Sequence, residues 1–474
     1  MTEVKIREAI LKDREAILKD RVFWLLLVFA ALYILGNIGT GSLSTFDEAI
    51  YANISKNIVK TGDWLVMRQG VKPWFDKPPL YMWCTAVLYK ILGVSEFSTR
   101  LTSGILGIAA VMILYLFAKK MTDKITASLA GLILLALPHY IHFSKMGMMD
   151  VPITFFTLLT LYLFWLGMER EKYLFYSGAI LCVAYLMKGF AAFLPLFIII
   201  VYAVLSKNVR FLLKRQFLLG TALALSVIFV WHLAQLMLLG PTALKEYFGF
   251  HIFQRATSVL EGHKGGFDYY IRVIFKKNIP WSILIFSSIF YAAYRYFKDK
   301  DKRLLFLLSW VFVTFFLYSA VRTKLQWYIM PIYPALALLS AFLLKGFLRK
   351  NLIYIAFVVI LAGMLVQVPL SWAFRLDYTP DIKNVSQIGR GLHTDGNDIY
   401  MISGNDSEIF YYDFAIELDK EVYRSLMSQG KGKIYCIILP GMFKDKKEDY
   451  NFDAEPIYES NRTSFYRIKF KDRK

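Results

Sequence analysis

Long apolar runs without a charge recur between residues 22 and 374, and few folds accept such a chain. A helix needs about 20 apolar residues to cross about 30 Å of hydrocarbon. The runs that approach this length are 22–40, 98–118, 125–142, 151–168, 173–187, 189–205, 217–239, 279–297, 304–320, 329–344 and 352–374. With 57% hydrophobic and 19% charged residues, the composition also departs from that of a soluble protein. The sequence predicts a polytopic α-helical membrane protein with about 11–13 transmembrane helices.

Short basic loops predict how the chain is oriented. If the apolar run 79–93 lies in the membrane interface, five Lys- and Arg-rich loops fall on one side. These loops are 119–124, 169–172, 206–216, 298–303 and 345–351. The positive-inside rule makes that side cytoplasmic. We therefore expect a multi-pass protein of the inner (cytoplasmic) cell membrane.

The net charge of +20 belongs to the membrane part, because residues 375–474 hold 16 Lys and Arg against 17 Asp and Glu. Such a surplus indicates anionic membrane lipids as partners and no nucleic acid. Three scattered cysteines form neither a disulfide framework nor a metal knuckle.

Two segments flank the membrane domain, 22–374. Residues 1–21 contain a repeated heptad that predicts a cytoplasmic amphipathic helix. Residues 375–474 predict a small extracytoplasmic α/β domain, which we interpret as a lid, docking or folding module. Its expected strands are 397–403, 433–439, 455–459 and 464–470, and its expected helices are 382–393 and 420–429.

Acidic side chains on the outer side are candidates for a site, because a carboxylate at a membrane boundary must be solvated, paired or bound to metal. Asp47 and Glu48 follow the first apolar run, and Asp150 precedes the run 151–168. Asp76 and Lys77 lie in a loop that Pro78 stiffens. Each also has a plain structural explanation, as a helix N-terminus or a surface ion pair.

Taken in order, the motifs resemble a known family. The segment FDEAIYANISKNIVKTGDWLVMRQGVKPWFDKPPLYMW is similar to the first external loop of GT-C glycosyltransferases of the bacterial ArnT/protein O-mannosyltransferase group. The resemblance continues through SKMGMMDVPITFF, LMKGFAAFLPL, LEGHKGGFDYYIRV and VRTKLQWYIMPIYPALALL, over about residues 20–345. It implies an inverting transferase that takes a sugar from a polyprenyl-phosphate donor such as undecaprenyl phosphate. The transfer would take place outside the cytoplasmic membrane, in loop 41–97.

The resemblance and the chemistry of a departing phosphate assign roles to particular residues. Cations must stabilise the leaving phosphate, and the expected binding residues are Lys77, Arg255, His263, Lys324 and Tyr328. The expected catalytic residues are Asp47, as general base or acceptor-orienting group, Asp150 and Lys77. A divalent cation is an alternative stabiliser, with Asp76 and Glu48 as candidate ligands, and no nucleotide is expected.

One position departs from the family pattern: Ile50 stands where the family has an arginine before the tyrosine. This departure leaves the sugar open. The acceptor also stays open among lipid, glycan and protein, with lipopolysaccharide or another cell-envelope glycan among the candidates.

A membrane transporter or lipid flippase is the alternative function. That class would carry ionisable groups inside its spans and an internal repeat. A third possibility is an inactive assembly partner. The oligomeric state is not predicted.

Overall fold

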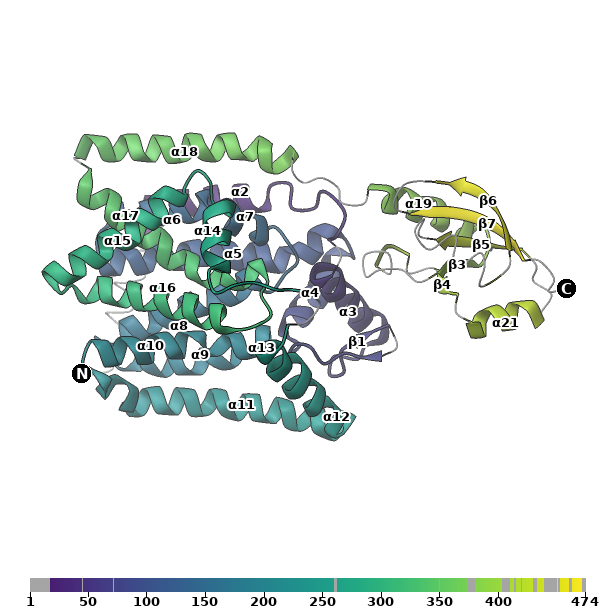
Figure 1. Cartoon of the computed structure of the whole chain (residues 1–474), viewed down its shortest axis with the longest axis horizontal. Helices are drawn as coiled ribbons and strands as arrows, with labels where there is room; N and C mark the ends of the chain where they lie inside the picture. Colours follow the sequence, from purple (N-terminus) through teal and green to yellow (C-terminus); the bar gives the residue numbers. More distant parts are fainter. Residues whose placement is uncertain are drawn as a thin grey trace.

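The computed structural model describes a bundle of roughly parallel helices with a small sheet domain beyond one end (Figure 1). The described residues are 18–44, 46–70, 72–259, 262–348, 350–373, 380–402, 410–412, 415–418, 420–428, 433–438, 450, 452–459 and 463–470. The expected amphipathic helix at 1–21 lies almost wholly outside them.

Apolar helices build the bundle. Its helices are α2 (Arg21–Leu35), α5 (Glu96–Met121), α6 (Lys124–Ala136), α7 (Pro138–Ser144), α8 (Asp150–Gly167), α9 (Lys172–Lys188), α10 (Leu194–Leu205), α11 (Arg215–Leu239), α15 (Ser282–Asp299), α16 (Lys302–Ala320), α17 (Tyr333–Phe347) and α18 (Lys350–Ala373). Shorter helical segments join them: η1 (Gly189–Phe193), η2 (Val209–Leu213), α12 (Pro241–Leu244), η3 (Lys245–Gln254), α13 (Arg255–Thr257), α14 (Tyr269–Lys277) and η4 (Gln326–Ile332).

Within the described residues, six helical segments are long and apolar enough to cross a membrane, or seven if the bent pair α6 and α7 is one span. Three of the expected eleven spans are missing from this count for identifiable reasons. The runs 173–187 and 189–205 belong to one segment of 34 residues, Lys172–Leu205. Helix α2 has only 15 residues, and α18 is counted only over Leu352–Val366, the part whose side chains the structure describes. The expected polytopic helical class is confirmed.

The five basic loops meet at one end of the bundle, as the sequence predicts. Lys120 Nζ lies 2.6 Å from Glu169 Oε2, and Lys214 Nζ lies 2.5 Å from Glu171 Oε1. Arg303 donates to the Met121 carbonyl at 3.0 Å. Lys345 Nζ is 3.9 Å from an oxygen of Asp123. These contacts tie together loops that lie far apart in the sequence.

The opposite end of the bundle carries α3 (Asp47–Thr61), α4 (Leu80–Leu92) and a short hairpin of β1 (Arg68–Gln69) and β2 (Lys72–Pro73), which lie between the bundle and the sheet domain (Figure 1). Helix α3 ends at Gly62, whose φ of 75° is left-handed and suits glycine. Helix α4 has only 13 residues. Its length fits the expected interfacial position better than a crossing.

The C-terminal domain is a five-stranded sheet in the order β4-β3-β5-β7-β6. Its strands are β3 (Ile399–Ile402), β4 (Ile416–Glu417), β5 (Lys433–Ile438), β6 (Phe452–Tyr458) and β7 (Ser464–Phe470), and its helices are α19 (Pro380–Thr394) and α21 (Lys420–Ser428). Strands β3, β4 and β5 are parallel, whereas β7 pairs antiparallel with both β5 and β6. The strands and helices lie close to the expected ranges, including the final hairpin.

This domain contacts the segments around α3 directly. The Tyr411 hydroxyl accepts a hydrogen bond from Leu43 N at 3.0 Å and donates to Glu96 Oε1 at 2.9 Å. Lys56 Nζ donates to the Phe410 carbonyl at 2.8 Å and lies 4.9 Å from the centroid of the Phe410 ring. The domain therefore helps to hold the segment that leads into α3.

Candidate functional site

A polar pocket lies where α3, the loop before α4, the end of α9, α13 and η4 meet. Its lining residues are Asp47, Ile50, Tyr51, Trp74, Asp76, Lys77, Lys188, Arg255 and Tyr328. Five of the expected site residues are among them. Three cations and two carboxylates therefore face one small space beside aromatic rings, which is a suitable environment for an anionic ligand.

Asp47 is the first residue of α3 and follows a strained residue. Phe46 has a φ of 71° and a side chain that is 73% exposed, a conformation that costs free energy for a bulky residue. One turn later, Ile50 and Tyr51 line the same pocket. Burial, followed by the charges of Asp47 and Asp150, raises the pKa of Tyr51 well above its usual value. Tyr51 is therefore a neutral hydroxyl at all ordinary pH values.

Glu48, by contrast, points away from the pocket and is buried against Arg100. Its Oε1 accepts from Arg100 Nε at 2.8 Å and Gly147 N at 2.7 Å. Its Oε2 accepts from Ser44 N at 2.7 Å and Arg100 Nη2 at 3.4 Å. Burial would raise the pKa of Glu48, but Arg100 and the two N–H donors outweigh it and lower that pKa. The expected metal-ligand role does not fit a carboxylate with this many donors.

Arg100 also holds the segment that leads into α3. Its Nη1 donates to the carbonyls of Ile38, Thr40 and Gly41 at 3.1, 2.8 and 3.3 Å, and its Nη2 donates to the Ser42 carbonyl at 2.9 Å. A planar guanidinium with five donors suits such a cluster of acceptors. Arg100 therefore fixes the loop that ends at Asp47.

Asp76 pairs with a histidine on η3, a π-helix, a form that is frequent at functional sites. His251 Nε2 lies 2.8 Å from Asp76 Oδ1. Burial would raise the pKa of Asp76, but the hydrogen bond and charge of His251, with Lys77 and Arg255, hold it below its usual value. The Lys77 ammonium donates to the Asp76 carbonyl oxygen at 3.2 Å.

Lys188 is a site residue that the sequence reasoning missed. It ends α9 and forms a buried ion pair with Asp150, which begins α8. Its ammonium also lies 5.5 Å from the Tyr328 ring centroid. The next residue, Gly189, has a φ of 64°, and a Cβ there would lie 2.4 Å from the Tyr247 hydroxyl. The signal in the sequence is a lysine between two apolar runs, since such residues are costly without a function.

Arg255 and Tyr328 close the other side of the pocket. Arg255 Nη1 lies 3.5 Å from the Tyr328 hydroxyl, the limit of a hydrogen bond. Backbone hydrogen bonds from Arg322 N to the Ala256 carbonyl and from Thr323 N to the Arg255 carbonyl bind the two segments together. The expected grouping of Arg255 with Tyr328 and Lys77 therefore exists as a geometric cluster.

Lys324 and His263 do not line this pocket. The Lys324 ammonium donates to the carbonyls of Ser319 and Val321 at 2.7 and 2.5 Å and so caps the C-terminus of α16. The His263 carbonyl accepts from Lys324 N at 3.2 Å. The geometry does not support the expected direct phosphate contact of Lys324, because its ammonium is engaged at the helix end.

Candidate metal ligands do not gather at one place in the described part of the chain. No group of three or more His, Cys, Asp or Glu side chains is arranged there to hold an ion. Asp76 and His251 form a pair only, and Glu48 belongs to the Arg100 cluster. The cations that line the pocket are the better-placed partners for negative charge.

A second, mostly apolar cleft shares Trp74 and Lys77 with the polar pocket. It is lined by Met67, Trp74, Phe75, Lys77, Pro78, Trp231, His232, Gln235, Ala243, Leu244 and Tyr247. Helix α11, which forms one wall, has many exposed apolar side chains. The cleft itself is small, about 20 Å³, but its apolar lining and the exposed apolar side chains of α11 place an apolar surface beside Lys77.

The position of Lys77 predicts a pH dependence. Burial, with the nearby charges of Arg255 and Lys188, holds the pKa of Lys77 below its usual value, although Asp76 and Asp47 oppose this. An ammonium holds an anion only while it is protonated, so binding of an anionic ligand in this pocket, and any activity that depends on it, should fall as the pH rises through this lowered pKa. The Lys77→Arg variant should extend activity to higher pH, because arginine stays protonated. An alkaline limb at the same pH in both proteins would contradict this, and Lys60→Arg on exposed α3 surface is the control.

The chain is similar to known proteins. Residues 76–233 match the profile of dolichyl-phosphate-mannose-protein mannosyltransferases. An uncharacterized protein of Aquifex aeolicus is 30% identical over 351 residues, 72% of this chain and 68% of that protein. An undecaprenyl phosphate-alpha-4-amino-4-deoxy-L-arabinose arabinosyl transferase of Aeromonas salmonicida is 27% identical over 67% of this chain, which spans 59% of that protein.

Solved structures show the same fold. ArnT from Cupriavidus metallidurans bound to undecaprenyl phosphate has a TM-score of 0.74 at 19% identity, over 94% of this chain and 97% of that one. The Archaeoglobus fulgidus oligosaccharyltransferase has a TM-score of 0.54 at 12% identity, over 95% of this chain and 74% of that one.

The family match and the fold identify a multi-pass membrane glycosyltransferase of the GT-C type. The chain belongs to the dolichyl-phosphate-mannose-protein mannosyltransferase family. The expected family is thereby confirmed.

Proposed function

We propose that this protein transfers a sugar from a polyprenyl-phosphate donor, such as undecaprenyl phosphate, to an acceptor hydroxyl. The single observation that carries the proposal is the convergence of Lys77, Lys188 and Arg255 on one pocket with Asp47. The exposed apolar side chains of α11 beside Lys77 support a lipid carrier. A glycosyltransferase structure solved with undecaprenyl phosphate shares the fold.

The reaction assigns a role to each group. The acceptor oxygen attacks the anomeric carbon as the bond from that carbon to the phosphate oxygen breaks, with inversion. The electron pair leaves with the polyprenyl phosphate, and Lys77, Arg255 and the Tyr328 hydroxyl stabilise its charge. Asp47 takes the proton of the acceptor hydroxyl. Asp150 acts indirectly, because its ion pair holds Lys188 against Tyr328.

We also propose that the reaction takes place on the outer face of the inner membrane. The pocket lies at the end of the bundle opposite to the end where the five basic loops meet. Because short basic loops favour the cytoplasm, the pocket would face the periplasm. The acceptor, whether lipid, glycan or protein, is not assigned.

Transfer itself tests the proposal. Purified protein in nanodiscs is given a polyprenyl-phosphate-linked sugar and extracted envelope lipids and glycoproteins, and products are identified by mass spectrometry. Wild type should release polyprenyl phosphate and add one sugar to one acceptor class. Lys77→Ala should lose at least about 100-fold in transfer, whereas Lys60→Ala should match wild type. Equal transfer by Lys77→Ala would refute the assigned site.

A further inference from the structure

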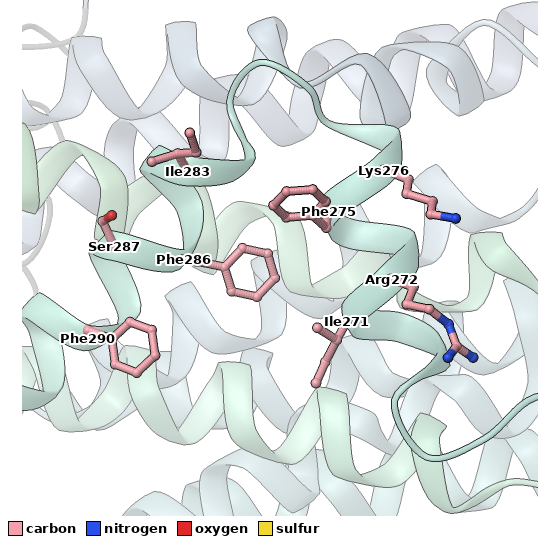
Figure 2. Close-up of a pocket in the computed structure, with 8 residues that line it drawn as sticks. All are labelled: Ile271, Arg272, Phe275, Lys276, Ile283, Phe286, Ser287 and Phe290. Carbon is pink, nitrogen blue, oxygen red and sulfur yellow. The ribbon is translucent and has the colours of Figure 1, made fainter.

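A separate groove, which shares no residue with the polar pocket or the apolar cleft, lies between α14 and α15 (Figure 2). It has a volume of about 520 Å³ and is lined by Ile271, Arg272, Phe275, Lys276, Ile283, Phe286, Ser287 and Phe290. Ile283 and Phe290 are 74% and 75% exposed. Such apolar exposure fits a surface that faces lipid, so the groove opens towards the membrane.

Helix α14 has two chemically different faces. One face is buried: the Tyr270 hydroxyl donates to the Leu325 carbonyl at 3.2 Å, and its ring packs on Tyr318, which contacts Tyr328 of the polar pocket. The outer face presents Ile271 and Phe275 to the groove. Helix α14 therefore separates the groove from Tyr318, which contacts Tyr328 of the polar pocket.

The cations of the groove lie together at one side. Figure 2 shows Arg272 and Lys276 pointing the same way from α14, away from Phe286 and Phe290. Arg272 pairs with Asp268, whereas Lys276 has no ion pair or hydrogen bond within the described part of the chain. The groove thus combines an apolar floor with an uncompensated positive charge at its rim.

Apolar surface alone cannot select a ligand in a membrane, because every lipid tail is equally apolar. Selection must come from the shape of the groove and the charge at its rim. A positive rim favours a lipid with net negative charge over a zwitterionic lipid with the same chains. We propose that the groove binds one acyl chain of an anionic phosphoglycerolipid, with its phosphate on Lys276 and Arg272.

This site is separate from the donor cleft and needs no particular sugar or acceptor. A bound lipid would pack against α14 and so restrict the motion of Tyr270, Tyr318 and, through them, Tyr328. Anionic lipid is therefore expected to raise turnover without changing the KM for the acceptor.

Native mass spectrometry of the delipidated full-length protein tests the proposal directly. Phosphatidylglycerol and phosphatidylcholine with identical chains are titrated separately, and wild type should bind one phosphatidylglycerol more tightly than phosphatidylcholine. Lys276→Gln should weaken the binding of phosphatidylglycerol about fivefold and leave the binding of phosphatidylcholine unchanged. Lys298→Gln, which removes an exposed lysine at the far end of α15, is the charge control.

The apolar half of the site needs its own variant. The indole of Ser287→Trp should fill the groove and abolish tight binding of phosphatidylglycerol. The Ser287→Ala variant should retain this tight binding. Equal binding of both lipids to wild type, or unchanged phosphatidylglycerol binding to both Lys276→Gln and Ser287→Trp, would overturn the proposal. A raised KM for the acceptor in Ser287→Trp with phosphatidylglycerol binding intact would also overturn it, because the groove would then serve a substrate.

Discussion

The Asp47→Asn variant should lose about 10²–10⁴-fold in kcat, the usual contribution of a general base, while it still binds the donor. Asp47 lines the pocket beside Lys77, Lys188 and Arg255, so its carboxylate lies near the place where the acceptor must meet the donor sugar. An amide of the same shape accepts no proton. The cations that would hold the phosphate remain, so the dissociation constant of the donor should change little.

Separate measurements of donor binding and single-turnover rate distinguish this prediction from a general loss of structure. Asp63→Asn is the matched control: Asp63 lies two residues after the end of α3 and accepts hydrogen bonds from Leu65 N and Val66 N at 3.1 and 3.0 Å. The amide oxygen of the substituted side chain can accept the same bonds, so this variant should keep full activity. Turnover of Asp47→Asn within threefold of wild type would exclude Asp47 as the base.

The architecture is predictable from the sequence because hydrophobicity and charge act locally. Each apolar run forms a helix whatever its neighbours are, and the positive loops sort to one end, as the contact between Lys120 and Glu169 illustrates. The span count was less predictable. Whether α9 and α10 form one segment or two depends on the short η1 turn at Gly189, which a hydrophobicity pattern does not resolve.

The site could be predicted only for those motif residues that the fold brings together in space. Asp47, Lys77 and Tyr328 do line one pocket, but adjacency in sequence misled at Glu48. Consecutive residues of a helix point about 100° apart, so Asp47 enters the pocket while Glu48 turns towards Arg100. Lys324 lies outside the pocket for a different reason. Its ammonium donates hydrogen bonds to carbonyls at the end of α16 instead. Such outcomes depend on tertiary partners.

The Arg100→Met variant should be strongly destabilised, by about 3–5 kcal/mol, because removing one member of a buried pair leaves the other charge uncompensated. Only 5% of the Arg100 side chain and 1% of the Glu48 side chain are exposed. The variant also removes the donor from four carbonyls of residues 38–42. The midpoint of thermal unfolding in detergent, followed by tryptophan fluorescence, measures the loss. Arg68→Met, which removes a one-third-exposed arginine 3.8 Å from Asp63, should cost at most about 1 kcal/mol.

The pH dependence of this loss identifies its cause. In wild type the pKa of Glu48 lies below its usual value, so the pair stabilises the fold above the unfolded pKa, and this stability is lost as the pH falls through the folded pKa. Without Arg100, burial should instead raise the pKa of Glu48. The gap between variant and wild type should then narrow as the pH falls, because Glu48 becomes neutral. The double variant Glu48→Gln/Arg100→Met should be more stable than Arg100→Met at neutral pH. A gap that is independent of pH would mean that the lost carbonyl hydrogen bonds, rather than the buried charge, dominate.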